Sequence, residues 1–270
     1  MGKDSVSVLL PFDDVKNIDY IHQINEKTDN NLYYDWDVVY NYSDIEIDNA
    51  ELFHVKINNV IEPCGEECGT KYDDNGSCPI CGAGRKQIST LNLTKIPSLK
   101  EYDIFKTISG EIIVSERFCE LVFNHKLCGL LLQPILINKK KSLRFMQLDA
   151  VMRVDISKKT RFGIDFFDTI NIPQSSEKKI NICGHEIAIP KEIYVCPNKD
   201  LMGLRLLSEL YIKKHPEHQC DFMKTSQYVG VRRGLLQPEP LYLCSKKFFD
   251  IVKENNISGL SFSIVKLSEN

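Results

Sequence analysis

The sequence lacks the features by which export signals, membrane anchors and most catalytic centres are recognised. No apolar run in its 270 residues approaches the roughly 20 residues needed to span a bilayer. Its first residues hold no apolar stretch of signal-peptide length. The motifs of phosphate-binding loops, dinucleotide-binding folds, serine hydrolases and zinc proteases are missing too. We therefore expect a cytoplasmic protein that is not an enzyme and does not bind a membrane.

Histidine is scarce, and the remaining hints of catalysis are weak. His215 and His218 are the only histidines close together among the six, and Pro216 between them disfavours the helical geometry of a zinc protease. Asp165 and Asp168 could pair as acid and base. Aspartates that alternate with aromatic residues, however, more often mark the wet face of a strand.

Charge is unevenly distributed along the chain. Residues 1–62 hold 13 acidic and four basic residues, whereas residues 63–270 hold 24 acidic and 30 basic residues. Aromatic residues accompany the acidic ones. Because aromatics supply contact area and carboxylates steer association, the segment predicts a docking surface for a basic partner. The alternative is a half-buried sheet with an acidic solvent face. The candidate partner-binding residues are Tyr33, Tyr34, Asp35, Trp36, Asp37, Asp44, Glu46 and Asp48.

Two segments share one strand–helix–strand pattern. In residues 111–137 an apolar strand leads to Ser115, a favourable helix N-cap, and Phe118 begins an apolar helical face that ends before Gly129. Residues 241–267 repeat this pattern 130 positions later without a gap. Separate physical causes that stay in register indicate an internal duplication. We also expect strands in residues 5–12, 32–61 and 143–200, and a helix over residues 199–216.

These elements predict an α+β fold with mostly antiparallel or mixed sheets. We expect two related lobes, each containing one strand–helix–strand unit. The first, residues 1–140, would hold the acidic, strand-rich start and a metal knuckle in residues 60–85. The second, residues 141–270, would hold the repeated unit.

Four of the ten cysteines gather in the spacing C-x3-C-x9-C-x2-C. Two close pairs can place four thiolates around one tetrahedral ion, which leaves no position for water or substrate. The ligand set predicted from this spacing is Cys64, Cys68, Cys78 and Cys81, and the predicted cofactor is one structural Zn²⁺ per chain. Iron held by four thiolates is the alternative ion. A second site formed by some of Cys183, Cys196, His215, His218 and Cys220 stays open.

The knuckle CPICG, followed by a strand, Ser-x-x-Phe, a helix and Gly-Leu, resembles the double-CXXCG motif paralogous family of myxobacteria. The ending CSKKFFDIVKENNISGLSFSIV looks like endings of immunity proteins in bacterial polymorphic toxin systems. The resemblance implies an immunity protein that binds and neutralises a cognate toxin domain stoichiometrically; a basic nuclease is one such toxin. In this chain the first cysteine pair is C-x3-C, and a second CXXCG is missing.

The alternative function is nucleic-acid binding by a zinc ribbon. Basic doublets and a triplet could contact phosphates, namely Lys139–Lys141, Lys178–Lys179, Lys213–Lys214 and Arg232–Arg233. The acidic residues 1–62 oppose this, because they would repel a phosphate backbone. The sequence does not indicate the oligomeric state.

Overall fold

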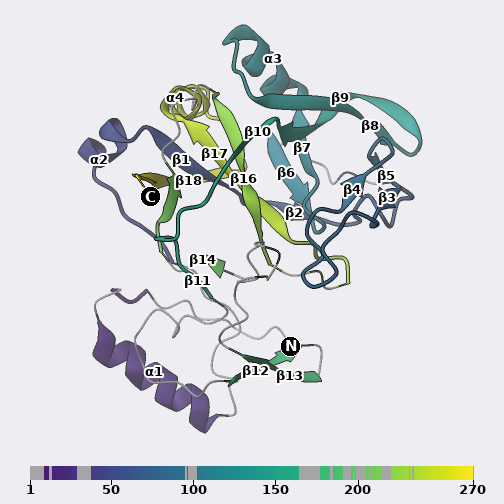
Figure 1. Cartoon of the computed structure of the whole chain (residues 1–270). Helices are drawn as coiled ribbons and strands as arrows, with labels where there is room; N and C mark the ends of the chain where they lie inside the picture. Colours follow the sequence, from purple (N-terminus) through teal and green to yellow (C-terminus); the bar gives the residue numbers. More distant parts are fainter. Residues whose placement is uncertain are drawn as a thin grey trace, which may run out of the picture.

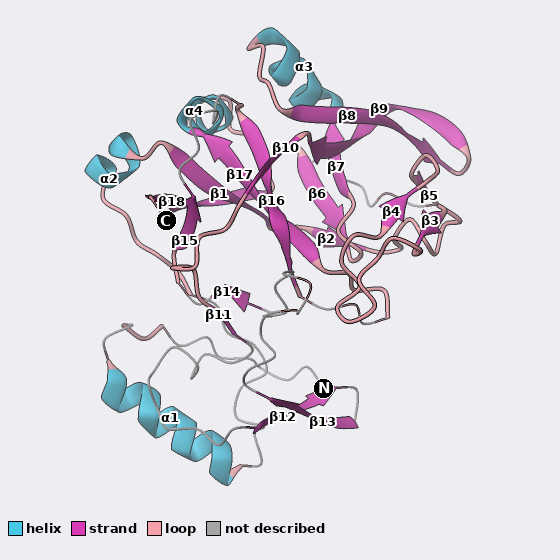
Figure 2. Ribbon diagram, viewed as in Figure 1, coloured by secondary structure: helices cyan, strands magenta, loops and turns pink. Residues whose placement is uncertain are grey.

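The structure is a computed structural model. It describes residues 9–11, 14–28, 38–94, 96, 102–163, 177–182, 185–190, 196, 198, 205–206, 208–213, 220–230, 232 and 234–269. Within these residues strands outnumber helices, and the two large sheets are mixed, with mostly antiparallel pairs (Figure 2). The predicted α+β class is confirmed. None of the described helices is long and apolar enough to cross a membrane.

The first large sheet has the strand order β2-β6-β7-β9-β8-β5. Its central pairs are antiparallel, and the short strands at its two edges, β2 and β5, run parallel to their neighbours. The strands are β2 (Val60–Ile61), β5 (Asn92–Leu93), β6 (Ile104–Thr107), β7 (Ile112–Ser115), β8 (Leu130–Ile137) and β9 (Lys140–Ala150).

The second large sheet has the order β10-β16-β17-β1-β18-β15. Its central pairs are again antiparallel and its edge strands, β10 and β15, again parallel. The strands are β1 (Leu52–Ile57), β10 (Met152–Val154), β15 (Leu210–Lys213), β16 (Phe222–Val229), β17 (Glu239–Ser245) and β18 (Leu260–Ser268).

The remaining elements are short pairs and helices. The two-stranded pairs are β3 (Tyr72–Asp73) with β4 (Lys86–Gln87), β11 (Phe162–Gly163) with β14 (Arg205–Leu206), and β12 (Glu177–Ile182) with β13 (His185–Pro190). The helices are α1 (Val15–Lys27), α2 (Asp44–Asn49), α3 (Glu116–Asn124) and α4 (Lys246–Glu254).

The two sheets exchange one long strand each. β1 comes from the first half of the chain but lies between β17 and β18 in the second sheet. β9, the corresponding strand of the second half, lies between β7 and β8 in the first sheet. After each exchanged strand the chain returns to its own sheet through an edge strand, β2 or β10 (Figure 1). The predicted boundary after residue 140 therefore falls inside this exchange.

Equivalent strand pairs keep the same register. Val60 pairs with Lys106 in the first sheet, and Arg153 and Lys224, which lie 93 and 118 positions later, pair in the second. Val55 pairs with Phe262, and the corresponding pair across β9 and β8 is Leu148 with Leu132. Because one residue of slippage would turn every side chain to the opposite face, this agreement reflects a shared plan.

The two predicted strand–helix–strand units are present. Ser115 and Ser245 cap α3 and α4, and each side-chain oxygen accepts a hydrogen bond from the backbone N–H of the phenylalanine three residues later. After each helix a glycine, Gly129 or Gly259, adopts a positive φ, +87° or +97°. A Cβ at either glycine would collide with a backbone carbonyl of the other sheet, so both positions require glycine.

Asp103 joins the first unit to the end of the second. Its carboxylate accepts hydrogen bonds from Ser115 Oγ at 2.9 Å and from the backbone N–H of Ser258 at 3.1 Å. Arg117 lies 2.9 Å from the same carboxylate. Asp103 is buried, so these donors offset the cost of removing its charge from water.

Asp221 makes the reciprocal connection. Ser245 Oγ donates to its carboxylate at 2.9 Å, and the backbone N–H of Cys128 donates at 3.0 Å. Lys247 lies 3.4 Å away, in the place that Arg117 takes beside Asp103. These hydrogen bonds lower the pKa of the Asp221 carboxyl, although its burial acts in the opposite direction.

One hydrophobic cluster spans both halves of the chain. Phe118 and Phe248 are fully buried on α3 and α4, and their ring centroids are 6.2 Å apart in an edge-on arrangement. Phe222 contacts Phe248 at 5.5 Å between centroids. Burying such rings contributes on the order of 2 kcal/mol each.

Two local expectations were wrong. Residues 44–49 form the helix α2 and not a strand, because Ser43 and Glu46 make a reciprocal capping box. Residues 210–213, inside the expected helix over 199–216, form the edge strand β15 against β18, where Leu210 and Ile212 alternate into the core. Of the expected strand over residues 5–12, only residues 9–11 are described, and they are not in a strand.

We predict that Phe118→Ala and Phe248→Ala each lower the free energy of unfolding by about 3–5 kcal/mol, because each leaves a cavity in the shared cluster. Phe123→Ala on the same helix is the control, since Phe123 is 68% exposed, and we expect a change below about 0.5 kcal/mol. Urea denaturation followed by circular dichroism measures all three. Similar costs at Phe118 and Phe123 would contradict the packing described.

Candidate metal centre

Cys78 and Cys81 lie in a tight turn that the local sequence favours. The backbone N–H of Gly82 donates to the carbonyl of Cys78 at 2.8 Å, and the N–H of Cys78 donates to the carbonyl of Ala83 at 2.7 Å. Gly82 has a φ of +82°, and a Cβ there would collide with the side chain of Arg232. The turn therefore depends on glycine after the second cysteine.

A third cysteine from the second half of the chain completes a cluster. The sulfur atoms of Cys78, Cys81 and Cys196 all lie within 4.8 Å of one another, and those of Cys78 and Cys196 are 3.5 Å apart. Cys81 and Cys196 are buried, while Cys78 is partly exposed. The side-chain amide of Asn198 donates to the Cys78 sulfur at 3.2 Å. Within the described residues this is the one cluster of at least three cysteine, histidine or carboxylate groups at such distances.

The three thiols have different proton affinities. Hydrogen bonds from the backbone N–H groups of Cys81 and Ile80 lower the pKa of Cys78 to about 6. Burial raises the pKa of Cys81 to about 12 and also raises that of Cys196. A bound cation would favour the ionised form of all three, because thiolates are the metal ligands.

The donor set fits a thiophilic metal ion. Three sulfurs at these separations can surround one ion, and soft thiolates select zinc, copper(I) or iron over magnesium or calcium. The structure thus supports a cysteine site that can hold a metal ion.

The predicted four-cysteine ligand set is not confirmed. Cys64 and Cys68 are not members of the cluster. Cys68 Sγ lies 3.4 Å from Thr94 Oγ1 and accepts from the backbone N–H of Thr94 at 3.3 Å. The Cys64 thiol is buried beside Ser109, and burial raises its pKa. Both thiols are used by local packing in the first sheet.

The other predicted site residues have varied positions. Cys183, His215 and His218 lie outside the described residues, and Cys220 lies beside Cys128 with a pKa raised by burial. Of the expected partner surface, residues 33–37 also lie outside the described residues. Asp44, Glu46 and Asp48 are exposed on α2.

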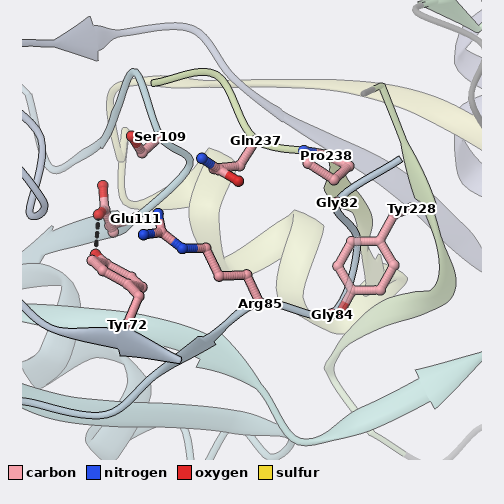
Figure 3. A pocket seen from close by; sticks show the side chains of 9 residues that line it. All are labelled: Tyr72, Gly82, Gly84, Arg85, Ser109, Glu111, Tyr228, Gln237 and Pro238. Atoms are coloured by element: carbon pink, nitrogen blue, oxygen red, sulfur yellow. Dashed lines mark hydrogen bonds between the residues drawn. The ribbon is translucent and has the colours of Figure 1, made fainter. Parts of the chain in front are cut away.

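A polar network supports the wall beside the cysteine turn (Figure 3). Arg85 forms two hydrogen bonds to Glu66, at 2.7 and 2.9 Å, and its guanidinium lies over the Tyr72 ring at 4.3 Å from the centroid. Tyr72 in turn hydrogen-bonds the buried Glu111. These groups line a cavity of about 110 Å³ together with Gly82 and Gly84 of the turn, Ser109, Tyr228, Gln237 and Pro238. Because the charged groups are already paired, they brace the turn against the sheets.

Glu111 is the buried carboxyl of this network. It is 7% exposed and accepts from the backbone N–H of Gly65 at 3.2 Å. The hydroxyl of Thr107 also contacts it. Burial raises the pKa of the Glu111 carboxyl above its usual value, although the hydrogen bond from Tyr72 acts in the opposite direction.

Comparison with known proteins gives no relative. No protein-family model matches the chain, and no curated protein is significantly similar to it.

We predict that Cys78→Ser, Cys81→Ser and Cys196→Ser each abolish stoichiometric metal binding, because each removes one of three clustered donors. The loss should also lower the free energy of unfolding, since metal binding adds to it. Cys68→Ser is the matched control and should keep the metal. Elemental analysis of protein purified without chelator measures the content. Retention of metal by Cys196→Ser together with loss in Cys68→Ser would contradict this site.

We predict that Glu111→Gln becomes more stabilising, relative to the wild type, as pH rises above about 4.5. The folded-state pKa is raised, so the wild type loses stability as pH rises from the unfolded-state value of 4.5 through the folded-state value. The glutamine does not ionise and escapes this loss. Urea denaturation of both proteins between pH 4 and 8 gives the difference. A difference that is constant, or that shrinks with rising pH, would show that burial does not destabilise the carboxylate.

Proposed function

We propose that this protein is an immunity protein that binds a cognate bacterial toxin domain one to one and thereby neutralises it. The observation that carries the proposal is the exposed acidic face of α2, which belongs to the strongly acidic first 62 residues. The resemblance of the CPICG knuckle and of the C-terminal unit to the double-CXXCG family, and to immunity proteins, supports the same function.

The acidic face divides into a structural and an exposed part. Glu46 serves the capping box, because its carboxylate accepts from the backbone N–H of Ser43 at 2.9 Å. Asp44 and Asp48 are exposed and take no part in that box. Tyr40 and Tyr42 stack at 6.1 Å between centroids just before the helix. Carboxylates beside aromatic rings favour fast association and slow release with a basic partner.

We infer that the ion at the cysteine cluster is one structural Zn²⁺ per chain. Zinc is redox-inert and accepts thiolates at tetrahedral positions. Its role would be to tie the segment around Cys196 to the turn at Cys78. The matching strand registers and the two reciprocal aspartate connections support the further inference that the chain consists of two duplicated, related lobes.

Nucleic-acid binding is the second candidate. The tip of the β8–β9 hairpin carries exposed Lys139, Lys140, Lys141 and Arg144. Leu143 at the same tip is 85% exposed. A basic projecting hairpin suits contacts with phosphates.

We predict that Asp44→Asn/Asp48→Asn lowers the rate of association with the toxin domain encoded beside this gene severalfold at 0.1 M salt. The effect should vanish at 1 M salt, where the Debye length falls from about 10 to about 3 Å. Stopped-flow mixing measures the rate at both salt concentrations.

Glu120→Gln/Glu254→Gln is the control, because it removes the same charge from exposed positions on α3 and α4. An equal loss of rate in the control would show that net charge acts and not the α2 face. Failure to bind the toxin domain, with tight and salt-sensitive binding to DNA or RNA that is lost in a Lys140→Ala/Lys141→Ala variant, would favour the second candidate.

A further inference from the structure

The segment around Cys196 repeats the cysteine turn of the first half. Cys78-Pro79 and Cys196-Pro197 are 118 positions apart. The same displacement relates the strand pair partners Lys106 and Lys224. Since that displacement comes from strand register, the match between the two Cys-Pro pairs is not a choice among many alignments.

The two turns also occupy equivalent places in the two halves. The first lies between β2 and β5, and the second lies between β10 and β15. Both pairs of flanking strands are the parallel edge strands of their sheets. The metal cluster therefore consists of one turn from each half, with its two first cysteines, Cys78 and Cys196, 3.5 Å apart.

The second turn has lost its second cysteine. Three residues after Cys78 stands Cys81, but three residues after Cys196 stands Lys199. A protonated lysine has no lone pair for a metal. Asn198 faces the cluster as a donor to the Cys78 sulfur, 3.2 Å away, and so does not act as a ligand in this arrangement. In the described part of the chain no fourth cysteine, histidine or carboxylate joins the three sulfurs.

We propose that the centre holds Zn²⁺ through the three thiolates of Cys78, Cys81 and Cys196 and keeps its fourth position for an exchangeable external ligand with a thiolate or imidazole group. Zinc sites with three protein ligands leave the fourth tetrahedral position to water or to a ligand. Three thiolates exceed the charge of the ion by one, so the site does not favour a hard anion. A soft or aromatic nitrogen donor suits it better.

The position of the turn gives such a ligand access. Cys78 is partly exposed, and Ile80, between the two cysteines of the first turn, is 48% exposed. Buried Cys81 and Cys196 hold the ion from the protein side. This inference rests on the zinc assignment made above and is independent of the toxin.

The test compares the full-length wild type with Lys199→Cys and Lys199→Ser. X-ray absorption of the zinc-loaded proteins should count three sulfur neighbours in the wild type and in Lys199→Ser, and four in Lys199→Cys. After cobalt(II) replaces zinc, imidazole or 2-mercaptoethanol should shift the visible spectrum of the first two proteins. Lys199→Cys should not respond, because its fourth position is filled.

Three results would overturn the proposal. Four sulfur neighbours in the wild type, reduced to three in Cys64→Ser or Cys68→Ser, would restore the ligand set expected from the sequence. A cobalt spectrum of the wild type that responds to neither ligand would show a closed fourth position. Protein purified without bound metal, and unable to take up zinc or cobalt, would remove both the site and the zinc assignment, whereas toxin binding is measured separately.

Discussion

The exchange of β1 and β9 is the constraint on which the rest of the structure depends. Each lies between two strands of the other half, so removing either would leave the backbone donors and acceptors of its neighbours unpaired in the middle of a six-stranded sheet. Phe53 on β1 stacks on Phe249 of α4 at 4.1 Å between centroids, so the exchanged strand also carries part of the core. Neither half of the chain holds a complete sheet or a complete core, and the two must fold together.

The exchange also explains why the metal centre joins residues 115 or more positions apart. After each exchanged strand the chain enters the edge strand of its own sheet, and the insertions that carry Cys78 and Cys196 start from these edges. The two reciprocal connections at Asp103 and Asp221 fix the sheets against each other. A metal ion between the insertions would add a link at a second place, independent of the hydrophobic cluster around Phe118.

Local patterns were predictable from the sequence and long-range pairings were not. The units around Ser115 and Ser245 were found because cap, apolar face and terminating glycine are all short-range signals. The exchange of β1 leaves no local signal, and a lone Cys196 looks like any buried thiol until its 118-residue displacement from Cys78 is set beside the strand registers. The helix α2 was missed although Ser43 and Glu46 form a readable capping box, because the flanking tyrosines favoured a strand.

The same constraint bears on how α2 would act in binding. The helix lies directly before β1, and Ile47 and Tyr42 pack against the core cluster that spans both halves. Its exposed carboxylates are therefore attached to the exchanged strand and not to an independent loop. Burial and a charge–charge interaction with Glu209 raise the pKa of Tyr42, as expected for a hydroxyl drawn into the protein. A surface held in this way has little conformational entropy left to lose on association, which leaves more of its charge and contact energy to stabilise a complex.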